Sequence, residues 1–183
     1  MNLLKTKLFL TLTNEIRKHS NCLLIKHSKN KKYLRNDIDF LSNDVELIKG
    51  LFSKKIFFRI NISNKENGYH IDFFKFNIFI LRIDISSSLK DNEIFRFKKS
   101  YYIDIFENKI DAKSSDDLFM KNFFIPKLEF ELLIRLSEYI NSPDKVHHKE
   151  YLKNNFSVLS SIEYNKYLDI YNQEKLDRFI GNI

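Results

Sequence analysis

The spacing of hydrophobic residues changes along the 183-residue chain and divides it into a mixed part and a helical part. An amphipathic stretch over residues 3–18 predicts a first helix. From there to residue 85 the apolar residues fall in short continuous or alternating runs, which are typical of strands. Beyond Pro126 they recur at helical spacing. We therefore expect an α/β (α+β) fold in which a mixed sheet with flanking helices is followed by a C-terminal helical appendage.

Short apolar runs mark the expected strands. In chain order these are 22–26, 37–41, 55–62, 69–76 and 78–85, with a shorter strand at 101–106. Asn67 and Gly68, which precede the fourth run, favour a hairpin. Ser42 or Asn43 suits the N-cap of a helix that we expect to run to about Leu51.

The helical appendage begins at Pro126, a residue suited to the first turn of a helix. One apolar stripe of the first helix consists of Leu128, Leu132, Leu133, Leu136 and Ile140. Further helices are expected over 144–153 and 160–171. We place the boundary where the pattern changes, so that residues 1–122 form the α/β core and residues 123–183 a helical region packed on it.

Composition narrows the class of protein. Hydrophobic residues make up 43% and charged residues 30% of the chain, which is a globular balance and not a disordered one. The single cysteine, Cys22, excludes a disulfide framework and a CxxC metal cluster. No apolar run approaches the roughly 18 residues of a membrane span, and no small-residue cleavage site follows the first helix. We therefore expect a cytoplasmic protein without a membrane span.

The net charge of +7 raises the question of nucleic-acid binding. The basic residues are spread along the chain, and the densest cluster is the short run 29–32. Lys, Asn, Ile and Phe are all abundant, as A/T-rich codons would make them without any binding role. We therefore do not expect a nucleic-acid partner.

Candidate chemistry centres on the run Asp37-Ile38-Asp39. Residues two apart on a strand face the same side, so Asp37 and Asp39 project together while Ile38 packs into the core. Two close carboxylates repel each other unless a cation lies between them, and Mg²⁺ prefers such oxygen ligands. The same spacing also fits an exposed, charged strand face that binds nothing.

A third carboxylate strengthens the metal interpretation. Asp84 lies between two isoleucines in a later strand, and Asp72 is a competitor for the same role. If either strand lies beside the strand of Asp39, three carboxylates converge, and such a set holds one or two metal ions for phosphoryl or nucleotidyl transfer. The alternative for Asp84 is an ion pair with Arg82.

The order of these features resembles the nucleotidyltransferase superfamily, which has the fold of DNA polymerase beta. More closely, it is similar to the nucleotidyltransferase-like proteins of bacterial surface-polysaccharide gene clusters. The shared features are an R-x-D-I-D strand that begins at Arg35, an h-x-h-D-h strand around Asp84 and a D-K-x-x-H segment that begins at Asp144. The resemblance covers about residues 20–155.

This resemblance implies an activity. It assigns catalytic and metal-binding roles to Asp37, Asp39 and Asp84, with Mg²⁺ as the cofactor and an NTP as the substrate. The nucleotidyl group would pass to a small acceptor, such as a sugar phosphate or a polysaccharide precursor.

The chain departs from the superfamily at the loop that grips the triphosphate. The usual Gly-Ser pair is absent before the DxD strand, and only Ser28 lies in the expected region. We expect Lys29, Lys31, Lys32 and Arg35 to supply the missing positive charge. Lys145 and His148 are candidates to reach a phosphate from the helical region, and the alternative for them is a solvated helix start after Pro143. The alternative is that catalysis has been lost and the protein is a non-catalytic accessory or interaction protein. The histidines have no HxxxH or HExxH spacing, so we do not expect zinc.

Overall fold

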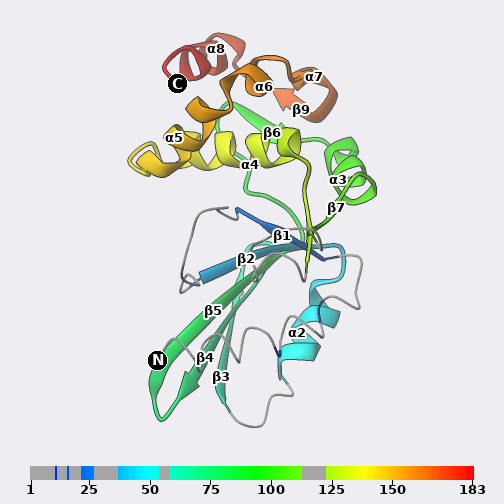
Figure 1. Ribbon diagram of the computed structural model, residues 1–183, viewed down its shortest axis with the longest axis vertical. Helices are drawn as coiled ribbons and strands as arrows, with labels where there is room; N and C mark the ends of the chain where they lie inside the picture. Colours follow the sequence, from blue (N-terminus) through cyan, green and yellow to red (C-terminus); the bar gives the residue numbers. More distant parts are fainter. Residues whose placement is uncertain (1–10, 12–15, 17–21, 27–36, 54–57, 113–122) are drawn as a thin grey trace. The chain divides into compact units, whose positions relative to one another are not determined.

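The computed structural model describes residues 11, 16, 22–26, 37–53, 58–112 and 123–183. Its contacts group the chain into two compact units (Figure 1): unit 1 comprises residues 1–88 and 110–125, and unit 2 comprises residues 89–109 and 126–183. This grouping differs from the boundary expected after residue 122. Residues 89–109 go with the C-terminal helices because the ring of Tyr101 packs against the rings of Phe130 and Tyr167.

Unit 1 is built on a mixed sheet whose described strands follow the order β3-β4-β5-β2-β1-β8-β7. The strands are β1 (Cys22–Ile25), β2 (Asp37–Ser42), β3 (Arg59–Lys65), β4 (Gly68–Lys75), β5 (Ile78–Ser86), β7 (Ile110–Asp111) and β8 (Phe124–Ile125). The pairs β2–β5 and β1–β8 are parallel, and the other pairs are antiparallel. The expected α+β class with a mixed sheet is therefore confirmed.

One face of this sheet carries the core of unit 1. Ile38 and Phe40 of β2 are buried there, as the alternation in the sequence predicts, and so are Ile83 and Ile85 of β5. Ile16 joins the same core. Its backbone is helical, which agrees with the helix expected over 3–18, most of which lies outside the described residues.

Helix α2 (Val45–Ser53) lies against the core face and contacts β4 and β5. Its Ile48 side chain is buried in the core. The carboxylate of Asp44 accepts a hydrogen bond from the backbone N–H of Leu47 at 3.0 Å. Asp44 therefore caps this helix, whereas the sequence pointed to Ser42 or Asn43. The hydroxyl of Ser42 supports the cap by accepting a hydrogen bond from the N–H of Asp44 at 3.1 Å.

The hairpin expected at Asn67-Gly68 joins β3 to β4, with Lys65 opposite Gly68. Gly68 does not have a positive φ, so the turn does not require glycine for its backbone conformation. A Cβ at Gly68 would instead lie 1.9 Å from the carbonyl oxygen of Ile85. Glycine is needed here because β5 passes too close for any side chain.

Unit 2 contains helices and a small two-stranded sheet among its described residues. The helices are α3 (Lys99–Glu107), α4 (Leu128–Asn141), α5 (Val146–Asn154), α6 (Phe156–Ser160), α7 (Tyr164–Tyr167) and α8 (Gln173–Gly181). Strand β6 (Phe95–Phe97) pairs antiparallel with β9 (Leu168–Ile170). An aromatic core of Phe97, Tyr101, Phe130 and Tyr167 joins these elements.

Two expectations for unit 2 are wrong. The strand expected at 101–106 is part of α3, because Tyr101 and Ile105 lie one helical turn apart and are buried together, while Ile103 between them is exposed. The helix expected over 160–171 is interrupted, because Leu168–Ile170 leaves the helical path to pair with β6.

Candidate functional site

The second face of the sheet in unit 1 carries the polar residues of β2, β4 and β5. We call it the polar face and define it by Asp37, Asp39, His70, Asp72, Arg82 and Asp84. Strand β5 lies directly beside β2, whereas β4 lies one strand further away. The sequence required the strand of Asp84 or that of Asp72 to lie beside the strand of Asp39, and only the strand of Asp84 does so.

Asp39 and Asp84 are register partners on the parallel strands β2 and β5. Because partners on neighbouring strands point to the same face about 4.8 Å apart, the two carboxylates arise side by side. Asp37, at the start of β2, lies opposite Arg82 on the same face and is exposed.

Asp39 is paired with a lysine from the end of β1. The distance from Lys26 Nζ to Asp39 Oδ1 is 2.7 Å, and both side chains are about one-fifth exposed. Lys26 follows β1 directly and has a φ of 55°, in the left-handed region that side chains other than glycine, asparagine and aspartate seldom adopt. Lys26 adopts this unfavourable backbone conformation at the position from which its ammonium group reaches the Asp39 carboxylate.

Asp84 is paired with a histidine across the antiparallel β4–β5 ladder. His70 is its register partner, and Nδ1 of the imidazole contacts Oδ1 of Asp84. The His70 side chain is one-third exposed and that of Asp84 is 17% exposed. This contact fixes the orientation of the Asp84 carboxylate on the polar face.

Asp72 is held by Arg82 and not by a residue of β2. The guanidinium donates from Nε to Oδ1 at 2.7 Å and from Nη2 to Oδ2 at 2.9 Å, a bidentate arrangement. The Asp72 carboxylate raises the pKa of Arg82 through these hydrogen bonds, and the charges of Asp84 and Asp37 act in the same direction. Arg82 therefore pairs with Asp72, and the ion pair considered for Asp84 and Arg82 does not form.

The donor set fits a magnesium ion in part. Mg²⁺ is commonly held by one or two carboxylates together with water and substrate phosphates, and Asp39 and Asp84 supply two adjacent carboxylates. Within the ranges that the structure describes, no three His, Cys, Asp or Glu side chains gather closely enough to hold a metal ion. Two carboxylates, and not three, are therefore the set that the described geometry offers.

The expected phosphate-binding residues are distributed differently. Ser28, Lys29 and Arg35 lie outside the described residues. Lys145 belongs to unit 2, where it precedes α5 and lies 3.9 Å from a carboxylate oxygen of Glu138. The nearby His148 is buried in unit 2.

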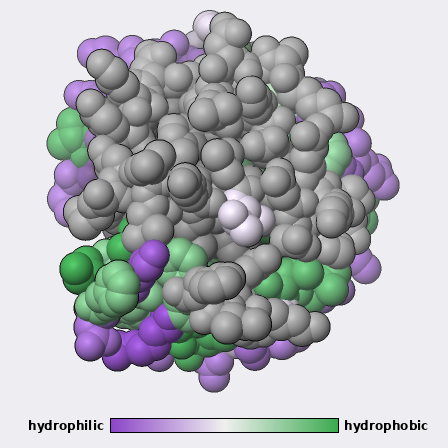
Figure 2. Space-filling model, turned by 60° about the horizontal axis from the view of Figure 1, so that its bottom comes forward, coloured by the Kyte–Doolittle hydropathy of each residue, from purple (hydrophilic) through white to green (hydrophobic). Residues whose placement is uncertain are grey.

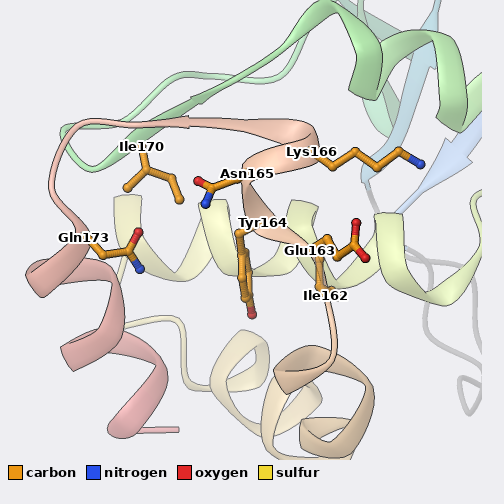
Figure 3. A pocket seen from close by; sticks show the side chains of 7 residues that line it. All are labelled: Ile162, Glu163, Tyr164, Asn165, Lys166, Ile170 and Gln173. Carbon is orange, nitrogen blue, oxygen red and sulfur yellow. The ribbon is translucent and has the colours of Figure 1, made fainter.

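Unit 2 contains polar features that the sequence did not reveal. A cavity of about 450 Å³ is lined by Ile162, Glu163, Tyr164, Asn165, Lys166, Ile170 and Gln173 (Figure 3). A second cavity, of about 310 Å³, shares Ile162, Glu163 and Lys166 with it. The ammonium of Lys166 is already engaged, since it lies over the Tyr167 ring and 3.2 Å from Asp104. These residues carry no spacing that would distinguish them in the sequence from an ordinary surface.

Comparisons with family models, with curated proteins and with solved structures found no match for this chain. None of the helices in the described part of the chain is long and apolar enough to cross a membrane.

Proposed function

We propose that the polar face of unit 1 is the site of a Mg²⁺-dependent nucleotidyltransferase that acts in the cytoplasm on an NTP and a small acceptor. The observation that carries the proposal is the register of Asp39 with Asp84 on adjacent parallel strands, with Asp37 on the same face. The acceptor class that the sequence resemblance favours is a sugar phosphate or a polysaccharide precursor.

Asp39 and Asp84 would hold the Mg²⁺ ion, and Asp37 is the further carboxylate on the same strand. When bound, the ion would neutralise triphosphate charge and polarise the phosphoryl group under attack. Transfer joins an acceptor oxygen to the α-phosphorus of the NTP and releases pyrophosphate.

The chain's own cations would bind and orient the substrate. The ammonium group of Lys26 lies beside the Asp39 carboxylate. With a cation bound to that carboxylate, the same ammonium group would contact a phosphate oxygen of the substrate. His70 holds the Asp84 carboxylate in place through its Nδ1 contact. The sequence adds Lys29, Arg35 and Lys145 as further candidates for phosphate contacts.

A second candidate function is a non-catalytic accessory protein with the same fold. The observation that favours it is the pairing of Asp39 with Lys26, Asp84 with His70 and Asp72 with Arg82. A face whose carboxylates already have positively charged or hydrogen-bonding partners can persist without any bound ion.

Thermal melting of the wild type and of Asp39→Asn, with and without Mg²⁺ and each NTP, separates the two candidates. A ligand that binds only the folded state adds about 2.7 kcal/mol at a hundredfold excess over its dissociation constant. We expect a melting shift in the wild type that Asp39→Asn abolishes. Asp91→Asn, an exposed site in unit 2, is the matched control and should retain the shift. A wild type that shows no shift with any NTP supports the accessory function instead.

A further inference from the structure

The turn between β4 and β5 holds a phenylalanine, Phe76, in a left-handed backbone conformation that phenylalanine seldom adopts. Phe76 and Asn77 connect the strands with φ values of 51° and 62°. Two-residue hairpin turns of this kind need positive φ at both positions, which asparagine and glycine tolerate and phenylalanine does not. The Phe76 ring is also 86% exposed, so burial within the described structure does not offset the cost.

The residues that follow the turn extend this apolar surface. Ile78 is 57% exposed and Phe79 is 38% exposed. Because successive strand residues point to opposite faces, these two side chains lie on the two faces of the ribbon and Phe76 lies at its tip. Figure 2 brings forward the end of the molecule where β4 and β5 meet, and it shows hydrophobic residues beside hydrophilic ones there.

Positive charge lies next to these apolar side chains. Lys75 Nζ lies 5.6 Å from the centroid of the Phe76 ring. Arg59, at the start of β3, lies over the Phe74 ring and donates a hydrogen bond to the Asn77 side-chain oxygen at 3.0 Å. The segment 73–81 contains no acidic residue. The end of this ribbon is therefore both apolar and cationic.

We infer that the β4–β5 turn inserts into the surface of an anionic lipid bilayer. A folded protein partner covers one face of a ribbon, whereas a bilayer interface surrounds the tip and both faces, where Phe76, Ile78 and Phe79 lie. Pairing of Lys75 with Ile78 satisfies backbone groups at the end of the ribbon, so insertion does not leave them without partners. Lys75 and Arg59 keep their charged ends at the level of the anionic headgroups.

Vesicle co-sedimentation of the full chain tests this inference. The probes are vesicles of phosphatidylcholine alone and of phosphatidylcholine with an equal part of phosphatidylglycerol. We expect the wild type to bind the anionic vesicles more tightly than the neutral ones. Phe76→Asn should weaken that binding about tenfold by removing the inserted ring, and Lys75→Gln about fivefold by removing one charge near the surface.

The Phe76→Asn variant separates a binding role from a structural one. Asparagine accepts positive φ more readily than phenylalanine, so the melting temperature should stay the same or rise while vesicle binding falls. Phe156→Asn in α6 is the matched control, because Phe156 is a 42% exposed phenylalanine of unit 2, and it should bind vesicles like the wild type.

Three results would overturn the inference. The first is a wild type that does not sediment with anionic vesicles. The second is Phe76→Asn binding as tightly as the wild type. The third is a protein that does not bind vesicles but uses Phe76 to bind a single-stranded oligonucleotide or to dimerise.

Discussion

Replacing Arg135 by methionine should destabilise the protein strongly, because it removes the arginine that pairs with a buried carboxylate. Arg135 donates from Nε to Glu131 at 2.8 Å, and the two side chains are 3% and 1% exposed. The guanidinium also lies 3.4 Å from Nδ1 of His148 and over the Tyr151 ring. Since arginine has no acceptor, the imidazole nitrogen is the acceptor in this contact.

The expected loss is about 3–5 kcal/mol, the usual cost of breaking a buried ion pair from one side. It would be a large fraction of the roughly 5–15 kcal/mol that stabilises a typical folded protein. Urea unfolding followed by circular dichroism gives this quantity directly. The double variant Glu131→Leu/Arg135→Met removes both charges, so it should recover most of the loss.

The pH dependence of Arg135→Met provides a second test. Removing the Arg135 charge beside the buried Glu131 carboxylate favours the neutral form of that carboxylate in the folded variant. The stability of the variant should therefore increase from neutral to mildly acid pH. A loss below about 0.5 kcal/mol, or a double variant as unstable as the single one, would refute this reasoning.

Three further predictions concern single sites. Gly68→Ala should cost more than about 1 kcal/mol in urea unfolding, because its Cβ would overlap the Ile85 carbonyl and force β5 to move; a neutral result would contradict the close approach. Asp44→Ala should cost about 1 kcal/mol through loss of the cap on the Leu47 N–H, and Asp44→Asn should restore most of it. Burial raises the pKa of Tyr164 from its ordinary value of 10.0 to about 12, so its contribution to stability is present below pH 10.0 and should be lost towards pH 12. Alkaline unfolding of Tyr164→Phe checks this, and a curve identical to that of the wild type would contradict it.

The sheet of unit 1 was largely predictable because its strands alternate. Ile38 and Phe40 against Asp37 and Asp39 define one buried and one polar face, and the structure reproduces both. The sequence did not give the reason for Gly68, because that reason is the approach of β5, a neighbour in space and not in the chain.

Unit 2 was less predictable because its central helix, α4, is buried on more than its apolar face. The stripe of leucines in α4 predicts one buried face, yet Glu131 and Arg135 are buried as well and Leu128 is 37% exposed. A helix covered on several sides by other elements buries polar residues when they pair with one another. Pairing of β9 with β6 likewise depends on residues about seventy positions apart, which local patterns do not register.

For the candidate site, the sequence identified the carboxylates but not their partners. The sequence left open whether the strand of Asp84 or that of Asp72 lies beside the strand of Asp39, and in the structure it is the strand of Asp84. Lys26 and His70 gave no signal, because a lysine after a strand and a histidine in a strand are common residues whose contacts depend on the register of neighbouring strands.

The measurement that tests the central claim most directly is Mn²⁺ binding followed by electron paramagnetic resonance, with Mn²⁺ in place of Mg²⁺, in the presence and absence of NTP. The account predicts NTP-dependent, saturable Mn²⁺ binding in the wild type. Asp39→Asn and Asp84→Asn should both abolish it, because their side chains supply the two adjacent carboxylates. Asp72→Asn should retain it, because Asp72 lies on β4, which does not neighbour β2, and its carboxylate is held by Arg82. Mn²⁺ binding that survives both Asp39→Asn and Asp84→Asn, or a wild type that binds no Mn²⁺ with any NTP, would contradict the account.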